Sequence, residues 1–136
     1  MKKRRRKKRH YHTGTHRSLK VLGGKLNYRS GWELEVAKFL DTDVSVKCYA
    51  YEALAIPYVA NTKTGRTRNY YPDFLVSYTD GTRLLVEVKR QDKVNSPVVR
   101  KKAAAARVWC EKNGTRYELW TNSTIELIRK QNNSMT

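Results

Sequence analysis

The sequence predicts an α/β domain in which a mixed β-sheet is flanked by helices. Three observations support this class: a helical pattern over residues 31–40, a series of strand patterns over residues 44–90, and a helix from residue 97 that is followed by one more strand and a short helix. The expected order of elements is therefore α-β-β-β-β-α-β-α. A chain of 136 residues is long enough for one domain with a substantial core.

The first helix is predicted to begin after Ser30, because serine is a favoured N-cap residue. Its apolar residues share one face with Glu33, whereas Glu35 is turned away. Glu33 therefore has two interpretations: it completes a capping box with Ser30, or it is a catalytic carboxylate that faces a cleft. The helix alone leaves both open. The apolar residues of that face are Val36, Ala37 and Leu40.

Four strands are expected next, over residues 44–51, 53–60, 70–78 and 82–90, because β-branched and aromatic residues are frequent there. Pro57 favours an edge or a bulge for the second of these strands, since proline cannot donate to a ladder. The strands are expected to pair as antiparallel neighbours.

A basic turn is predicted at residues 61–68, where Gly65 marks a hairpin. A solvated loop is the simple interpretation of this turn. The surplus of positive charge favours a second interpretation, in which Arg66 and Arg68 contact phosphate groups.

The second helix is predicted to begin at Pro97, because proline suits the first turn of a helix. It contains Lys101 and Lys102, which we also expect to contact nucleic acid, and four alanines that allow close packing on a sheet. A strand over residues 115–120 and a short helix over residues 122–130 complete the domain.

Two carboxylates and a lysine lie inside the third and fourth strand patterns. Glu87 and Lys89 are two residues apart and share a strand face. A three-residue loop at residues 79–81, with glycine at its left-handed position, would place Asp73 directly opposite Glu87. Cross-strand partners have Cβ atoms roughly 5 Å apart. Two carboxylates at such a short distance repel each other unless a cation lies between them. A two-residue loop would instead turn Asp73 to the other face.

This arrangement has two interpretations. Asp73, Glu87 and Lys89 can form a structural ion-pair network, or they can hold a divalent metal beside a cation that acts on a phosphate. We favour the second, because a core-facing Glu33 also precedes the three residues.

The charge of the chain indicates a polyanionic partner. The sequence has 29 Lys and Arg against 12 Asp and Glu, for a net charge of +17. Nucleic acid is favoured over a membrane, since the basic tail has no apolar face and no apolar run is long enough to span a bilayer. The residues of the basic tail expected to bind nucleic acid are Lys2, Lys3, Arg4, Arg5, Arg6, Lys7, Lys8 and Arg9.

The predicted organisation has four parts. Residues 1–20 are expected to form a disordered basic arm, residues 21–29 a linker, and residues 30–131 the folded domain. Residues 132–136 are expected to form a disordered tail.

The motif Glu33, Pro72-Asp73 and Glu87-Val88-Lys89 resembles that of the PD-(D/E)xK nuclease superfamily. Three stretches, at residues 28–33, 55–58 and 69–74, resemble the TnsA-like endonucleases and among them the small phage head-completion nucleases. The resemblance covers residues 28–90 well and the remainder by element order only.

The resemblance implies a restriction-endonuclease-like core and a DNA endonuclease that depends on Mg²⁺, for which Mn²⁺ can substitute. Asp73, Glu87 and the backbone carbonyl of Val88 would be metal ligands, and Glu33 would hold a second metal or a metal-bound water. Lys89 would orient the attacking water or stabilise charge on phosphorus. The implied products carry 5′-phosphate and 3′-hydroxyl ends.

The resemblance also implies a setting. The protein would act in the cytoplasm of a bacterial host or within a virion, in DNA processing or head completion, with a homodimer and phage structural proteins as candidate partners. The alternative function is a non-catalytic nucleic-acid-binding or packaging protein, and the basic arm alone is also compatible with a nuclear-localisation signal.

Overall fold

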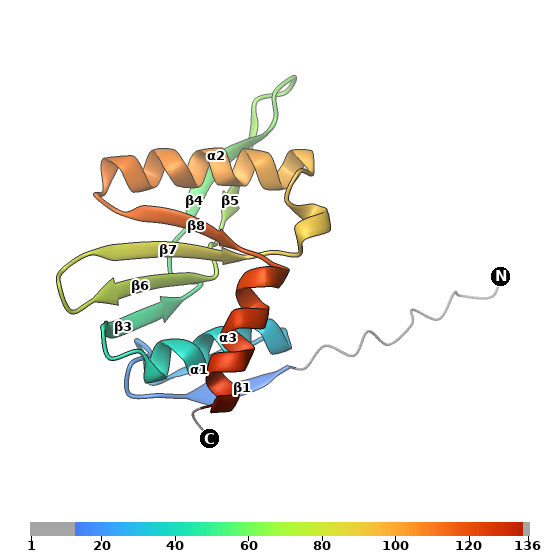
Figure 1. Ribbon diagram of the computed structural model, residues 1–136. Helices are drawn as coiled ribbons and strands as arrows, with labels where there is room; N and C mark the ends of the chain where they lie inside the picture. Colours follow the sequence, from blue (N-terminus) through green and yellow to red (C-terminus); the bar gives the residue numbers. More distant parts are fainter. Residues whose placement is uncertain (1–12, 135–136) are drawn as a thin grey trace, which may run out of the picture.

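A computed structural model describes residues 13–134 of the chain (Figure 1). Its centre is a four-stranded sheet in which the strands follow the order β3, β6, β7 and β8. β6 runs antiparallel to both β3 and β7, and β8 runs parallel to β7, so the sheet is mixed. The bounds of these strands are Val46–Tyr51 for β3, Phe74–Tyr78 for β6, Arg83–Val88 for β7 and Arg116–Trp120 for β8.

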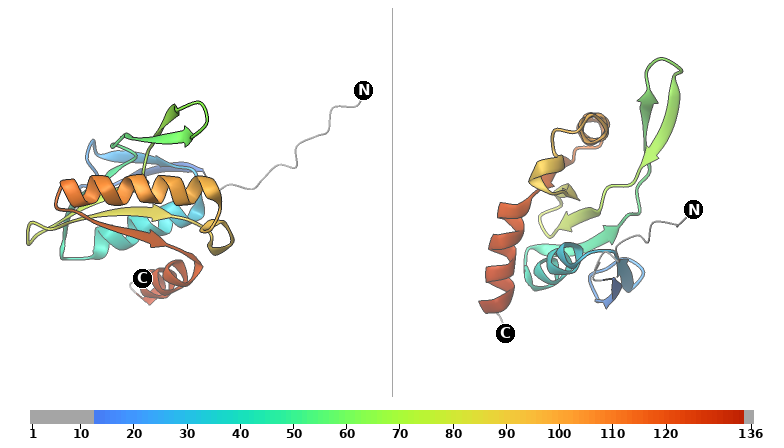
Figure 2. Two further views of the ribbon diagram at one scale, coloured as in Figure 1. Left: turned by 90° about the horizontal axis from the view of Figure 1, so that it is seen from above. Right: turned by 90° about the vertical axis from the view of Figure 1, so that its right-hand side faces the viewer.

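Helices flank this sheet, so the predicted fold class is confirmed and is consistent with a restriction-endonuclease-like fold. α1 and α3 pack on each other and on the larger hydrophobic core (Figures 1 and 2). α2 packs on a smaller core with β8 and with the hairpin of β4 (Ile56–Asn61) and β5 (Arg66–Tyr70). The helices are α1 at Gly31–Thr42, α2 at Pro97–Lys112 and α3 at Asn122–Ser134, with a short 3₁₀ turn at Gln91–Lys93 before α2.

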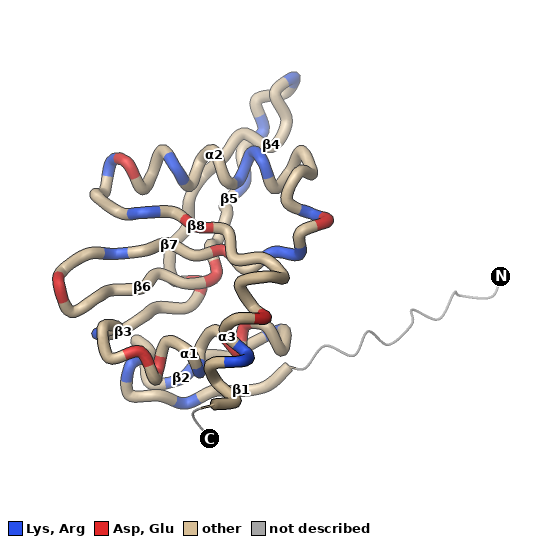
Figure 3. The backbone as a smooth tube through the Cα atoms, in the orientation of Figure 1, with Lys and Arg blue, Asp and Glu red and all other residues tan. Residues whose placement is uncertain are grey.

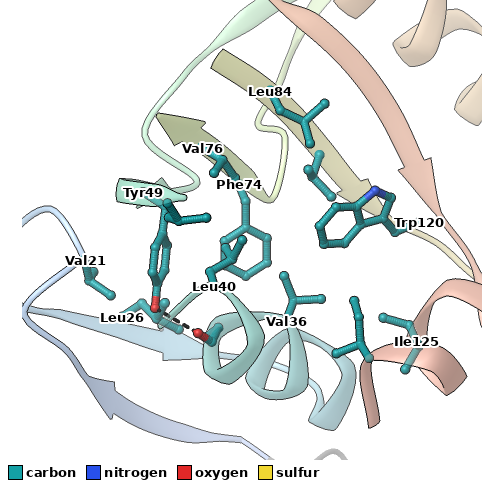
Figure 4. Close-up of a cluster of buried hydrophobic side chains, with 14 residues drawn as sticks. Val21, Leu26, Val36, Leu40, Tyr49, Phe74, Val76, Leu84, Trp120 and Ile125 are labelled. Carbon is teal, nitrogen blue, oxygen red and sulfur yellow. Dashed lines mark hydrogen bonds between the residues drawn. The ribbon is translucent and has the colours of Figure 1, made fainter. Parts of the chain in front are cut away.

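Successive side chains of β7 point to opposite faces of the sheet, so each face packs against a different hydrophobic core. Leu84 and Val86 belong to the larger core, which α1 and α3 close (Figure 4). Leu85 belongs to the smaller core with Ala106 of α2. Glu87 follows Leu85 at a spacing of two, so it lies on the α2 face of the sheet.

The β6–β7 hairpin has the predicted three-residue loop. The Tyr78 amide donates to the carbonyl of Thr82 at 2.9 Å, and Gly81 has a φ of 90°, in the left-handed region that glycine tolerates. The ladder pairs Phe74 with Val86, and the same register one residue further places Asp73 opposite Glu87. The expectation on which the site geometry depends is therefore confirmed.

The β4–β5 hairpin corrects two predictions. β4 spans Ile56–Asn61 and β5 spans Arg66–Tyr70, so the basic turn is shorter than predicted and its last residues are a strand. The predicted strand over residues 70–78 is two strands, because Pro72 has no amide hydrogen for a ladder and lies where the chain passes from β5 to β6. Five strands, instead of four, therefore separate α1 from α2.

The predicted linker at residues 21–29 is also wrong, as is disorder for residues 13–20. β1 at Gly14–Arg17 and β2 at Lys25–Tyr28 form an antiparallel hairpin. Val21 and Leu26 are buried in the larger core, and burial of these two apolar side chains fixes the hairpin against the domain.

Hydrogen bonds strengthen that attachment. The Leu22 amide donates to the carbonyl of Tyr49, and the Tyr49 amide donates to the carbonyl of Lys20, both at 2.9 Å. Asp41, near the end of α1, accepts from the hydroxyl of Ser18 at 2.6 Å and pairs with His16.

The C-terminal boundary of the folded domain also differs from the prediction. α3 continues to Ser134, so the disorder predicted from residue 132 is wrong for residues 132–134. The Asn132 side chain donates to the Glu35 carboxylate at 2.7 Å, which ties this last turn to α1. The basic residues 2–9 lie outside the described residues.

Candidate active site

The two predicted carboxylates lie together at one end of the sheet. Asp73 immediately precedes β6, and Glu87 lies near the end of β7 with only 7% of its surface exposed. They open into a cleft of about 330 Å³ whose lining is mainly polar. The lining residues are Arg29, Glu33, Glu52, Asn69, Tyr70, Tyr71, Asp73, Glu87, Val88, Lys89 and Lys102.

Asp73 is held by the neighbouring strand. Its Oδ2 accepts a hydrogen bond from the backbone amide of Val88 at 2.7 Å, and its own backbone carbonyl accepts from the amide of Glu52 at 3.0 Å. Burial raises the pKa of Asp73 well above its ordinary value, and the negative charge of Glu87 raises it further. The carboxyl group is therefore buried and lies close to a second negative charge.

Lys89 lines the same cleft without neutralising these carboxylates. The ion pairs within residues 13–134 join His16 to Asp41, Arg29 to Glu52 and Arg90 to Asp92. None of them involves Asp73, Glu87 or Lys89 in this part of the chain. The geometry therefore disfavours the structural ion-pair network that the sequence left open.

Glu33 both takes part in the hydrogen bonds at the start of α1 and lines the cleft, so its catalytic role stays a prediction. Its backbone amide donates to the Ser30 hydroxyl at 3.2 Å, and its carboxylate accepts from the amide of Arg29 at 3.1 Å, so it helps to cap α1. The reciprocal bond goes to Arg29 instead of the N-cap residue that a capping box uses. The same carboxylate accepts from the Tyr51 hydroxyl and lines the cleft.

The carboxylates do not form a complete metal cage. Across residues 13–134, no group of three or more His, Cys, Asp or Glu side chains is placed to hold a metal ion. Glu33 thus shares the cleft with Asp73 and Glu87 without joining them in a three-carboxylate cluster. Any cation at the opposed pair would take its remaining oxygens from backbone, water or substrate.

Sequence reasoning missed several residues of the cleft. Arg29 and Glu52 form an ion pair at the cleft, and Glu52 has a φ of 48°, an uncommon left-handed conformation for this residue type. The signal in the sequence was a single charged residue between two strand patterns. Its partner Arg29 is 23 residues away and was not predictable from spacing.

A pair of tyrosines lies beside Glu87. The hydroxyls of Tyr70 and Tyr117 are 3.3 Å apart. Burial raises the pKa of Tyr70, with a smaller contribution from the charge of Glu87, and burial raises the pKa of Tyr117 to about 12. Both hydroxyls therefore stay protonated and can donate hydrogen bonds at neutral pH.

Figure 3 shows Lys and Arg positions along β5 and α2, the two elements that carry the four predicted DNA-contacting residues of the domain. Arg66 and Arg68 are exposed on β5, and with Lys101 of α2 they line a second hollow of about 280 Å³. The Lys101 ammonium donates to the carbonyl of Ala60 at 3.1 Å, which joins α2 to β4. Lys102 lines the cleft itself, 5.6 Å from the centre of the Tyr70 ring.

Comparison with known proteins gives two matches. Residues 43–122 match the family described as TnsA-like endonuclease N terminal, and this span includes Asp73, Glu87 and Lys89. The chain is also similar to the head completion nuclease of Enterobacteria phage T4, with 30% identity over 74 residues. That alignment covers 54% of this chain and 49% of the relative, so the chain spans about half the length of the curated protein it matches.

No helix within residues 13–134 has the length and apolar character needed to cross a membrane.

Proposed function

The chain belongs to the TnsA-like endonuclease N-terminal family, and from this premise we propose that it is a metal-dependent DNA endonuclease. One observation carries the proposal: two opposed carboxylates, Asp73 and Glu87, lie in an open polar cleft beside Lys89, and no ion pair in the described residues neutralises them. A purely structural role would have paired these charges.

The donor set fits a magnesium ion. Asp73 and Glu87 offer carboxylate oxygens, the Val88 carbonyl is a further oxygen donor, and Mg²⁺ prefers one or two carboxylates with several waters. The pKa of Asp73 is raised partly by the negative charge of Glu87, and a cation bound between the two carboxylates would relieve this repulsion. Bound there, Mg²⁺, or Mn²⁺ in its place, supplies positive charge and lowers the pKa of water for attack on phosphorus.

The protein's own groups complete the chemistry. The Lys89 ammonium stabilises negative charge that develops on the scissile phosphate, and within residues 13–134 no ion pair with a carboxylate engages it. Glu33, fixed by Tyr51 and the Arg29 amide, holds water from the helix side of the cleft. The products are DNA ends with 5′-phosphate and 3′-hydroxyl groups.

The biological setting is part of the proposal. The matched relative is named for head completion, which favours a phage protein that acts on DNA in a bacterial cytoplasm or in the virion, with phage structural proteins as candidate partners and a homodimer as a candidate assembly. The competing function is a basic protein that binds or packages nucleic acid without cutting it.

The test is cleavage of supercoiled plasmid DNA with Mg²⁺ and with EDTA. The wild type should cut only with Mg²⁺, and Asp73→Asn and Glu87→Gln should each be inactive while still binding DNA. Glu111→Gln is the matched control, because it also removes one carboxylate but lies exposed near the end of α2. Equal cutting by all four proteins, or no cutting by the wild type with either Mg²⁺ or Mn²⁺, would refute the proposed function.

A further inference from the structure

The β4–β5 hairpin and α2 enclose a basic hollow that the proposed cleavage chemistry does not use. The hairpin extends beyond the sheet beside α2 (Figure 2). Its side chains at Tyr58, Arg66 and Arg68 and those of Val98 and Lys101 on α2 line a hollow of about 280 Å³.

The hollow carries positive charge without compensation from nearby acids in the sequence. The hairpin segment between Glu52 and Asp73 contains no Asp or Glu, and neither does the segment between Asp92 and Glu111 that includes most of α2. Four acidic residues line the cleft instead, namely Glu33, Glu52, Asp73 and Glu87. Such separation of charge suits a polyanion that extends along the hollow and reaches the cleft with one of its groups.

The two hollows are joined through Tyr70. Arg66, Arg68 and Tyr70 alternate along β5 and therefore share one face. Tyr70 lines the cleft together with Lys102, while the two arginines line the basic hollow. One strand face thus leads from the opposed carboxylates to the tip of the hairpin.

The spacing along this face suits duplex DNA. Residues two apart on a strand are separated by roughly 6.7 Å. Phosphates of one DNA strand recur about every 3.4 Å along the helix axis. Two guanidinium groups at this separation can therefore contact different phosphates of one DNA strand.

We propose that the face of the β4–β5 hairpin towards α2 is a phosphate-binding groove for duplex DNA, in which Arg66 and Arg68 contact the backbone of the segment that flanks the cleavage site. This inference rests on the proposed function for the position of that site. Lys101 has a different task in it, because its bond to Ala60 holds the two walls of the groove together.

The test is a salt titration of the affinity for one duplex oligonucleotide, in EDTA so that no cleavage occurs. The double variant R66Q/R68Q should lower the slope of log affinity against log salt by about 1.8, from 0.9 for each phosphate contact. Between 50 and 200 mM salt the wild type would then lose roughly twelvefold more affinity than the variant. Because both arginines are exposed, the variant should fold, and its unfolding midpoint verifies this.

The matched control is R129Q/K130Q, which removes the same charge from exposed positions on α3, a helix that packs on the other core. The inference is supported if only R66Q/R68Q flattens the slope. It is overturned if the two double variants behave alike, since net charge would then explain the effect, or if neither changes the slope. Plasmid cleavage by the wild type tests the proposed function separately. If the protein never cuts DNA but binds it through Arg66 and Arg68, the phosphate-binding groove is supported and the endonuclease function is refuted.

Discussion

Replacing Asp73 with asparagine should stabilise the folded protein at neutral pH when no divalent cation is present. Burial and the neighbouring Glu87 both raise the pKa of Asp73, because both disfavour its charged form. Asparagine keeps the oxygen that accepts from the Val88 amide, and its amide group can donate to Glu87 where the carboxylate repels it. The variant therefore exchanges a repulsive contact for a hydrogen bond.

The size of the gain follows from that exchange. A hydrogen bond to a charged acceptor contributes about 1.5–3 kcal/mol to the free energy of unfolding. For a chain of 136 residues this corresponds to a rise in Tm of roughly 5–10 °C. An exposed carboxylate such as Glu111 offers no such gain, and Glu111→Gln should stay within about 0.5 kcal/mol of the wild type.

The gain has a defined dependence on pH. A carboxyl group whose pKa is higher in the folded than in the unfolded state binds its proton more tightly when folded. The wild type therefore loses stability as pH rises from the ordinary value of 3.8 through the raised pKa of Asp73, and this loss is complete above it. Asp73→Asn lacks this loss of stability, so the free energies of unfolding of the two proteins should differ least in acid and most above the raised pKa of Asp73.

Urea unfolding in EDTA at acid and neutral pH measures the difference, and the same experiment with added Mg²⁺ completes it. Magnesium should stabilise the wild type by binding the folded state, and should stabilise Asp73→Asn much less. If Asp73→Asn is less stable than the wild type at neutral pH in EDTA, the carboxylates do not repel one another and the electrostatic argument for a cation site fails.

Four further predictions concern the cleft, its supporting hairpin and the basic tail. Lys89→Ala should lose roughly 10²–10³ in kcat with DNA binding retained, as single-turnover cleavage at saturating DNA would show. Glu33→Ala should lose cleavage activity and about 1 kcal/mol of stability, because the Glu33 carboxylate also helps to cap α1. Glu35→Ala should cut DNA normally. The reverse pattern of activity would mean that the other face of the helix carries the function. Gly81→Ala should cost about 1–2 kcal/mol in urea unfolding, since its φ is 90°. Deleting residues 2–9 should flatten the salt dependence of duplex affinity by about 3–4, and an unchanged slope would assign the tail to some other partner.

The placement of Asp73 opposite Glu87 was predictable because its determinants are local. Gly81 fixes the loop length, the loop length fixes the register, and the register sets Asp73 opposite Glu87. Each step uses residues fewer than twenty apart, where turn chemistry and the two-residue period of a strand leave few alternatives. Pro97 and the helix that follows it were predictable for the same reason.

The features that sequence reasoning missed depend on distant partners. The β1–β2 hairpin looks polar along the sequence, and its order depends on the burial of Val21 and Leu26 and on hydrogen bonds to Tyr49 and Asp41. The break between β5 and β6 was hidden because Tyr70 and Phe74 both favour strands, although the chain changes sheets between them. The Arg29–Glu52 pair joins two connections that no periodicity relates.

The position of the carboxylates explains how the fold tolerates them. Leu85 and Glu87 share the α2 face of β7, but Leu85 is completely buried with Ala106 whereas Glu87 lines the cleft. Packing around Leu85 fixes the strand within two residues of the charge, so repulsion between Asp73 and Glu87 cannot be relieved by movement of the backbone. The sheet thus holds two acidic groups at a separation that only protonation or a cation can relieve, and a rigid support of this kind is what a preorganised metal site requires.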